Sequence, residues 1–482
     1  DSNETEDILK EAHGEAKGRN AKKVEIACIG VAGENLSLLS AVMNDKGRAA
    51  GRSGVGAVMG SKKLKAIAVS GSADIPLYDP EKAKAVRKEY MKKTGGAYSL
   101  FRDYGTIGIT GESVMTGDAP IKNWGGVGMV DFPSGKKKFH KDTVIAYQEK
   151  KYGCWKCTMS CGGEMSVKEP GPYQGTKHHK VEYETAGAWG TMTLTDNFPM
   201  LIKITELCNK YGFDTIGTGC TAAFAVECYE NGILTKEDTG GLELNWGNDE
   251  ALVALLTKMA MREGIGDVLA DGVRKAAEKI GKGSEQYAIH VQGSEVPMHD
   301  PKFQPGLATS YKMDATPARH TQGHEDMPPV LEGWPEHDKY VYTGKGDLHK
   351  KCSEMTHVVN SAGVCLFAFL SYDWNFMPAF LSAVTGWDID TEESLKIGER
   401  IANIRHAFNL REGLNPIEFK VPDRLIGNPP QTEGNVRHVT VDIDAQVRDY
   451  CEVMDWDPVT GLPSKERLLS LGLDKVAADL HP

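Results

Sequence analysis

Three cysteines lie within eight residues of one another, in the pattern Cys154-x2-Cys157-x3-Cys161, with glycines on both sides. Three thiolates at this spacing can reach three corners of a 4Fe-4S cluster, and the glycines let backbone amides approach its sulfides. The fourth thiolate must come from elsewhere, and Cys365 is the best candidate by context. Zinc and a redox dithiol are the alternatives. Zinc sites usually pair two Cys-x2-Cys motifs, and a dithiol leaves Cys161 unexplained.

A second chemical signal is the stretch from Gly47 to Lys63, which is dense in glycine, arginine and lysine. Backbone N–H groups and guanidinium groups in such a loop bind phosphate well, so the stretch predicts an anion-binding cradle. A tight strand-to-strand turn is the alternative. The dinucleotide fingerprint is not matched, because Gly60 comes one residue late, and the Gly-Lys-Ser/Thr ending of a P-loop is missing.

These signals must be positioned by a small β-rich block and a longer helical part. Apolar runs predict strands at 23–31 and 64–69, and helical periodicity with caps predicts helices at 81–93, 197–211, 218–230, 248–262, 266–280 and 391–411. Residues 1–18 read as a helix, and 296–327 as a long ordered loop rich in Pro, His and Gly. The fold class is α+β. Three domains are expected: a partial β-rich domain (1–77), a helical domain with the cysteine motif (78–288) and a second helical domain (289–482).

Bulk properties exclude several classes of protein. The chain has 482 residues and a net charge of −11, which repels nucleic acid. No apolar run is long enough to span a membrane. Ten cysteines are too few for a disulfide framework and favour a metal site in a reducing, cytoplasmic compartment.

Several motifs, in order along essentially the whole chain, resemble the aldehyde:ferredoxin oxidoreductase family. They are the segment from Ala32 through Arg48–Arg52 to Met59–Lys62, the three cysteines, Glu182–Thr185, Tyr211–Gly219, the histidine-containing loop after Asp300-Pro301, Ser361–Cys365 and Ile397–Arg400. Residue 1 is not methionine, and the resemblance implies that the family's opening segment, half of its pterin-binding β domain, is absent from this chain.

The resemblance implies tungsten, or molybdenum, held by two pyranopterins, with magnesium bridging the pterin phosphates and a 4Fe-4S cluster alongside. It assigns roles residue by residue: cluster ligands Cys154, Cys157, Cys161 and Cys365; phosphate and magnesium contacts Arg48, Ala49 and Gly51; pterin-ring contacts Asn209, Asp214, Asn360 and Val364; and the acid–base pair Glu184 and His320. Asn360 stands where many members have Asp. Lys203-Ile-Thr-Glu206 stands where some have a Glu-x-x-His pair that bridges subunits. Arg319 adds a cation beside His320.

The implied reaction is oxidation of an aldehyde to a carboxylic acid, with electrons leaving through the cluster. The acceptor is ferredoxin or a partner subunit with iron–sulfur or flavin groups, and homo- or hetero-oligomers are compatible with the family. An equally acidic ferredoxin would be repelled unless a local basic patch offsets the net charge, and the sequence alone does not locate one.

Three rival functions stay open. Relatives that reduce an aromatic ring on a coenzyme A thioester use a cysteine ligand to the metal, and the Glu182-Tyr-Glu-Thr185 stretch favours aldehyde chemistry instead. The chain could also be a non-catalytic iron–sulfur electron relay. The third rival is a zinc-stabilised binding protein.

Overall fold

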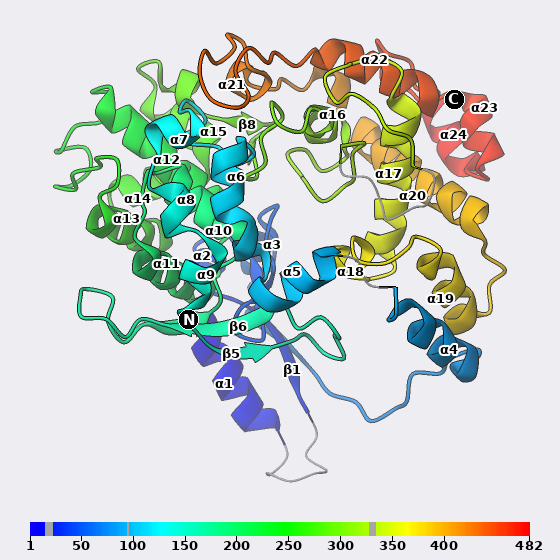
Figure 1. The fold of residues 1–482 in the computed structure, drawn as a ribbon, viewed down its shortest axis with the longest axis horizontal. Coiled ribbons are helices and arrows are strands. Elements are labelled where there is room, and N and C mark those ends of the chain that lie inside the picture. The colour runs from blue at the N-terminus through cyan, green and yellow to red at the C-terminus, as the bar shows by residue number, and fades with distance from the viewer. Residues whose placement is uncertain (15–22, 94–95, 327–333) are drawn as a thin grey trace. The chain divides into compact units, whose positions relative to one another are not determined.

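The computed structural model describes residues 1–14, 23–93, 96–326 and 334–482. It contains two compact units. Unit 1 comprises Asp1–Asp74, Tyr104–Met298 and Glu433–Asn435, and unit 2 comprises Ile75–Asp103, His299–Thr432 and Val436–Pro482. Helices account for 48% of the chain and strands for 8%, which confirms the α+β class with mainly helical parts (Figure 1). Within the described ranges, no helix is both long and apolar enough to cross a membrane. The three-domain division stays a prediction.

The first sheet of unit 1 is antiparallel, with strand order β3-β2-β1-β4. Its elements and the neighbouring short helices are β1 (Glu25–Ile29), α2 (Val31–Glu34), β2 (Val42–Asn44), β3 (Arg48–Ala50), α3 (Val55–Ser61) and β4 (Ala66–Val69). β1 and β4 confirm the two predicted strands. Helix α1 (Ser2–His13) lies along β1 (Figure 1) and confirms the predicted opening helix; residues 15–18 of that prediction lie outside the described residues.

The second sheet of unit 1 carries the cysteine motif. Its strands are β5 (Gln148–Tyr152), β6 (Gly162–Ser166) and β7 (Lys177–His179), in the order β5-β6-β7, so β5 is an edge strand. The three cysteines fill the loop between β5 and β6. A small two-stranded ribbon, β8 (His290–Val291) and β9 (Ser294–Glu295), completes the strands described in this unit.

The helices of unit 1 surround a fully buried one. Its helical segments are η1 (Thr106–Ile109), α6 (Thr110–Thr116), α7 (Gly128–Asp131), α8 (Gly135–Lys138), α9 (Lys141–Ile145), α10 (Tyr183–Ala186), the π-helical turn η2 (Gly187–Thr191), α11 (Phe198–Tyr211), α12 (Thr215–Glu230), α13 (Asp249–Met261), α14 (Ile265–Leu269), α15 (Val273–Ile280) and η3 (Ser284–Tyr287). Every residue of α12 from Ile216 to Cys228 is buried. A helix that is apolar all round belongs in the centre of a core, and α12 occupies that place.

One helix of unit 1 that was predicted to be continuous is interrupted in the structure. The sequence predicted a single helix at 266–280, whereas the structure has α14 and α15, interrupted at Gly272 with φ +86°. The Glu295 carboxylate accepts the Val273 N–H at 2.8 Å, and a Cβ on Gly272 would lie 2.4 Å from that carboxylate. A buried side chain from outside the helix therefore caps α15, which local periodicity cannot reveal.

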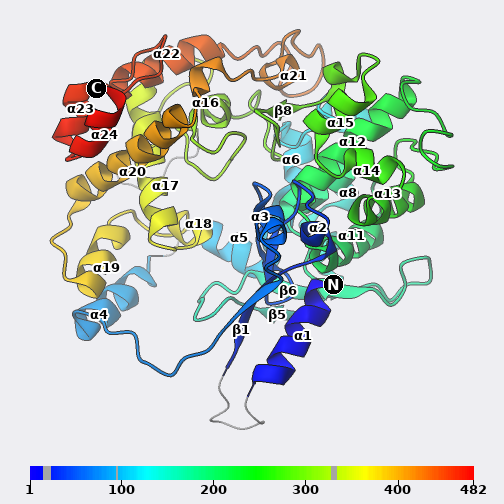
Figure 2. The same ribbon diagram turned by 180° about the vertical axis from the view of Figure 1, so that it is seen from behind.

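Unit 2 is a helical assembly in which α17 and α20 run side by side (Figure 2). Its segments are α4 (Pro80–Tyr90), α5 (Gly96–Tyr104), α16 (Gly306–Met313), α17 (Gly346–Ser361), α18 (Leu366–Phe369), α19 (Phe376–Thr385), α20 (Thr391–Arg411), η4 (Pro416–Glu418), α21 (Asp423–Ile426), α22 (Ile443–Met454), α23 (Lys465–Ser470) and α24 (Asp474–Leu480). α20 confirms the predicted 391–411 helix. The 296–327 stretch is not loop throughout, because it contains α16; residue 327 lies outside the described residues.

Buried histidines make the stability of unit 2 sensitive to acid. His406 is 1% exposed, stacks on Trp456 with ring centroids 3.8 Å apart, and donates to the Gly461 carbonyl at 2.7 Å. Burial lowers the pKa of His406 to about 4. In the unfolded chain the His406 side chain therefore binds a proton near pH 6.5, whereas in the folded chain it binds one only near pH 4. Stability is retained above pH 6.5 and lost as the pH falls toward 4.

We expect His406→Gln to flatten this pH dependence, because glutamine can still donate to Gly461 but does not titrate. The histidine should account for a loss on the order of 3 kcal/mol between pH 6.5 and pH 4. Denaturant unfolding at several pH values measures it, with the exposed His438→Gln as control. An identical slope in His406→Gln and the unsubstituted protein would contradict the assignment.

Candidate active site

The cysteine loop is tight and lies at the surface of unit 1. The Cys157 N–H donates to the Cys154 carbonyl at 2.9 Å, and Lys156 adopts a left-handed φ of +53°. Cys154 and Cys157 are exposed, and Cys161 is half-buried where the chain enters β6. The three thiols therefore lie on one short loop, and their role as cluster ligands stays a prediction.

Arg48 is the cation next to this loop. It is the first residue of β3, where it pairs with Asn44, and its guanidinium lies over the Tyr152 ring, 5.3 Å from the centroid. Its one ion pair described in unit 1 is with Glu182, at 3.6 Å between Nη1 and Oε1. Burial alone would lower the pKa of Arg48, but Tyr152, Glu182 and the nearby thiols raise it on balance, so the group stays cationic.

Two nitrogens of Arg48, Nε and Nη2, are buried without a hydrogen-bond partner among the described residues. A Cβ on Gly162 would lie 2.7 Å from Nη2, so only glycine at the start of β6 lets the guanidinium occupy this place. The same side chain lines a cavity of about 660 Å³ together with Tyr152, Cys154, Trp155 and His179. A half-buried guanidinium with two unused donors that lines a cavity fits an anionic group such as a phosphate.

The other predicted cofactor contacts of unit 1 are Ala49, Gly51, Asn209 and Asp214, and they differ in exposure and in hydrogen bonding. Ala49 is exposed, and a Cβ on Gly51 would meet only Ala49, so the backbone here faces open space. The Asn209 amide lies 3.3 Å from Nδ1 of His178. Asp214 caps α12 by accepting the Ile216 N–H at 3.0 Å, and its other oxygen binds Arg52 Nε at 3.0 Å. The Asp214 carboxylate is thus neutralised inside unit 1. Arg52 belongs to the glycine-rich stretch that was predicted to bind an anion, but its pairing with Asp214 was not predicted.

Glu184 is fixed by the backbone of a distant residue. It belongs to α10, and its Oε2 accepts the Met298 N–H at 2.9 Å, while the neighbouring Tyr183 hydroxyl donates to the Met298 carbonyl at 2.5 Å. The chain continues into the π-helical turn η2, where a Cβ on Gly187 would lie 2.4 Å from Met298 Cγ. Gly187 therefore makes room for Met298. Glu182 and Glu184 do not alternate along a strand, because the segment is helical.

In unit 2, His320 lies beside a second histidine that the sequence analysis did not single out. The rings of His299 and His320 are 5.3 Å apart, and the His299 carbonyl accepts the Tyr311 hydroxyl at 2.8 Å. His324 is 1% exposed, and burial lowers its pKa to about 4. The signal for His299 was its position directly before Asp300-Pro301, in the segment already noted for its histidines.

The remaining predicted residues form the C-terminal turn of α17. The Asn360 amide donates to the Thr321 carbonyl at 3.3 Å, and Gly363 takes a left-handed φ of +69°. This turn leaves Val364 half-buried and Cys365 exposed. Asn360 thus touches the segment that carries His320. That Cys365 is the fourth cluster ligand stays a prediction.

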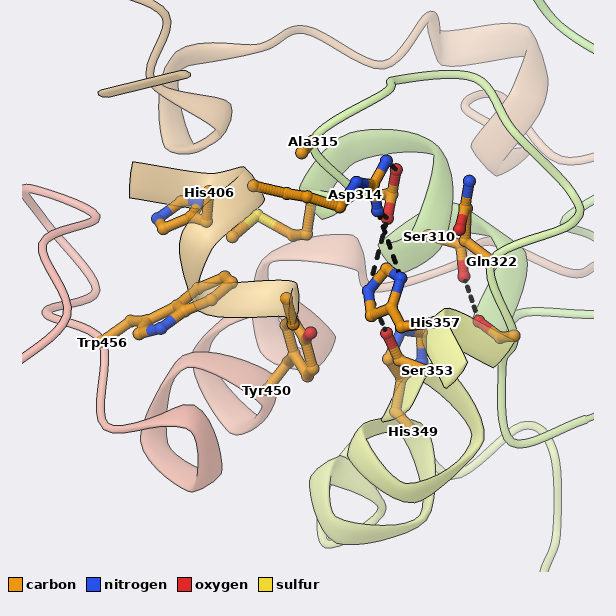
Figure 3. Close-up of a pocket in the computed structure, with 14 residues that line it drawn as sticks. Ser310, Asp314, Ala315, Gln322, His349, Ser353, His357, His406, Tyr450 and Trp456 are labelled. Carbon is orange, nitrogen blue, oxygen red and sulfur yellow. Dashed lines mark hydrogen bonds and ion pairs between the residues drawn. The ribbon is translucent and has the colours of Figure 1, made fainter. Parts of the chain in front are cut away.

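The segment that carries His320 is clamped at its start by α20. Arg405 binds the largely buried Asp314 through two nitrogens, at 2.9 and 3.1 Å, and binds the Thr316 hydroxyl at 2.8 Å. Figure 3 shows Asp314 and His357 facing each other in a pocket with Ser353 and Tyr450. Nδ1 of His357 lies 3.2 Å from Arg405 Nη1. Sequence periodicity could not have paired residues that lie some 90 positions apart.

We expect Arg405→Gln to loosen this segment, because it leaves the Asp314 carboxylate without its charged partner. The free energy of unfolding should fall by about 2 kcal/mol. Amide hydrogen exchange between residues 314 and 326 should rise more than in the rest of unit 2. Arg411→Gln, at the exposed end of the same helix, is the matched control and should change stability by less than about 0.5 kcal/mol. Equal effects of the two substitutions would argue against the clamp.

Comparison with known proteins identifies the family of this chain. Residues 1–71 match the family model for the aldehyde ferredoxin oxidoreductase N-terminal domain, and residues 81–473 match the model for domains 2 and 3. The chain is 34% identical to the tungsten-containing aldehyde ferredoxin oxidoreductase of Pyrococcus furiosus, over 94% of this chain and 74% of that protein. The Thermococcus kodakarensis protein of the same name is 33% identical, over 98% and 76%. The chain therefore belongs to the aldehyde ferredoxin oxidoreductase family.

Two further matches are one relative in sequence and one solved structure of similar fold. The aliphatic sulfonate oxidoreductase, WOR-like subunit, of Pyrococcus furiosus is 32% identical over 98% of this chain and 75% of that protein. Among solved structures, the active site complex BamBC of benzoyl coenzyme A reductase with 1,5-dienoyl-CoA superimposes with a TM-score of 0.76. The superposition covers 99% of this chain and 77% of the matched chain at 22% sequence identity, and it shows that the two share a fold.

Proposed function

We propose that this chain oxidises an aldehyde to a carboxylic acid at a tungsten bis-pterin, with electrons leaving through a 4Fe-4S cluster to a ferredoxin-type acceptor. The observation that carries the proposal is the cavity in unit 1 where Arg48 and Cys154 share one wall. A phosphate-binding cation and a cluster thiol in a single cavity are what a pterin next to an iron–sulfur cluster requires. The two relatives named for tungsten and aldehydes support the same reading.

The family resemblance assigns the residues that would hold these groups, and the cavity beside Arg48 supports the assignment for the phosphate and the cluster. Arg48, through Nε and Nη2, would bind a pterin phosphate, with the open backbone at Ala49 and Gly51 beside it for the phosphates and magnesium. Asn209, Asp214, Asn360 and Val364 would line the pterin rings. Cys154, Cys157 and Cys161 would bind the cluster, with Cys365 as fourth ligand. When bound, the tungsten pterin supplies a two-electron acceptor for the oxidised carbon.

The chain's own part in the reaction is positioning and proton transfer. Aldehyde and water become carboxylic acid, two electrons and two protons. We propose that His320 donates a hydrogen bond to the substrate carbonyl, which makes the carbon more electrophilic. Glu184 then accepts a proton from the attacking water at its Oε1, while Oε2 stays held by the Met298 amide. A carboxylate fixed on one side keeps its second oxygen aimed, which general-base catalysis needs.

Elemental analysis of anaerobically purified protein tests the cofactors directly. We expect one tungsten and about four irons per chain. Arg48→Met should lose most of the tungsten because the phosphate anchor is gone, whereas the exposed Arg102→Met should retain it. Iron without tungsten or molybdenum would favour the electron-relay function, and zinc alone would overturn the cluster assignment.

Replacing Glu184 tests the proton-transfer step. Glu184→Gln should keep an acceptor for the Met298 N–H and therefore keep tungsten and iron. Aldehyde turnover should fall by roughly a hundredfold or more, because a glutamine cannot take the proton. Glu237→Gln, on the exposed connection between α12 and α13, is the control and should retain full turnover. Full activity in Glu184→Gln would remove this residue from the mechanism.

A second substrate class follows from the sulfonate-oxidising relative and from Arg319. This arginine directly precedes His320 and is half-buried in the same segment of unit 2. A cation there would bind an anionic substrate such as an organic sulfonate. Assay of aldehydes and alkyl sulfonates side by side separates the two. Sulfonate turnover that Arg319→Met abolishes, without aldehyde turnover in the parent protein, would replace the aldehyde proposal.

A further inference from the structure

The sheet that carries the cysteine motif is positively charged at the surface, although the whole chain has a net charge of −11. Lys150 and Lys151 are exposed on edge strand β5, and Lys156 is exposed in the cysteine loop that follows. The single glutamate between residues 148 and 161 is Glu149, which lies 3.0 Å from Lys168 and 3.4 Å from Lys177. The local sign of charge is therefore opposite to that of the chain as a whole.

Trp155 adds a large apolar group to the same loop. It lies between two of the cysteines and is 73% exposed, and the Lys156 ammonium sits over its ring at 4.5 Å from the centroid. An exposed tryptophan is typical of protein–protein interfaces, where Trp is enriched relative to the rest of the surface.

Edge-strand protection explains only part of this arrangement. Lysines on an edge strand discourage pairing with another chain, and that accounts for Lys150 and Lys151. It does not account for Lys156 and Trp155, because they lie in the loop, which offers no strand edge to protect. Among the described residues, no carboxylate forms an ion pair with Lys150 or Lys156, so these cations are available to a partner.

We infer that Lys150, Lys151, Trp155 and Lys156 form the docking surface for a small acidic iron–sulfur protein that receives the electrons. The inference rests on the proposed function, since it needs a cluster on Cys154, Cys157 and Cys161. Electron transfer requires close approach, and two of these thiols are exposed on the loop that bears Trp155. With a cluster bound, each encounter would pass one electron from the cluster to the carrier, so the two electrons released from one aldehyde would need two encounters. Acidic side chains of the carrier meet the lysines, and an apolar patch meets Trp155.

The test is the affinity of the purified protein for an acidic bacterial-type ferredoxin, measured by calorimetry at low and high salt. Lys150→Glu/Lys151→Glu should raise the Kd about tenfold at low salt and flatten its salt dependence. Lys156→Glu, outside the strand, should raise it by a smaller factor. Lys82→Glu/Lys84→Glu, two exposed lysines on α4 of unit 2, is the charge-matched control and should leave the Kd unchanged. Iron content confirms that each variant keeps its cluster.

An unchanged Kd in Lys150→Glu/Lys151→Glu, or an equal rise in the control, overturns the docking surface. This failure is distinguishable from failure of the proposed function. If the variants bind ferredoxin normally while the parent oxidises aldehydes with viologen as acceptor, the docking surface is wrong and the reaction stands. If ferredoxin binding weakens as expected but no aldehyde is oxidised, the docking surface stands and the substrate is wrong.

Discussion

Arg48 carries a half-buried guanidinium whose Nε and Nη2 atoms are buried without a hydrogen-bond partner among the described residues, so the group needs an anion. Removing a cation from water costs several kcal/mol unless its hydrogen bonds and charge are matched. The Glu182 carboxylate lies 3.6 Å from Nη1 of Arg48, but it forms no hydrogen bond with Nε or Nη2. Yet Gly162 keeps space clear beside Nη2, and Tyr152 presents its ring to the guanidinium. The hairpin of the first sheet and the cysteine sheet thus present an unsatisfied cation to one cavity, an arrangement that a bound phosphate would make favourable.

A second constraint is the hydrogen bonding of the Met298 backbone. Both main-chain polar groups of Met298 are bound by adjacent side chains, Tyr183 and Glu184, and Gly187 makes room for its side chain. Met298 is the last residue of unit 1 in this part of the chain, and the next residue is His299. Glu184, proposed as general base, is thus held by the residue that directly precedes His299 in the chain. A short carboxylate held by a backbone amide loses little entropy when substrate binds, because its rotamer is already chosen.

The sequence predicted what local patterns and a family resemblance can carry. The strands at β1 and β4 and the helices at α11, α12, α13 and α20 follow from periodicity and caps, because their ends are set by neighbouring residues. Sequence-based prediction failed where a side chain distant in sequence sets the end of an element. Glu295, for example, caps α15 and so divides a helix that was predicted to be continuous. The same holds for the candidate site: Arg48 was found by its glycine-rich context, whereas His299 and Arg405 act through partners distant in sequence. The pairing of Glu184 with His320 rests on resemblance alone, and Cys365 as a ligand rests on its sequence context and on resemblance.

The proposed docking surface is positively charged on a chain whose net charge is negative, and the two charges act on a carrier at different distances. At long range a protein of charge −11 repels an acidic carrier, and salt screens that repulsion beyond about 8 Å at physiological ionic strength. Within that distance the few lysines beside Trp155 dominate, so they orient a carrier more than they attract it. A small patch of this kind favours a weak, quickly dissociating complex, as electron-transfer encounters generally are. That suits a reaction in which two carriers must arrive and leave for every substrate molecule, since a tighter surface would slow release of the reduced carrier and hold back the second electron.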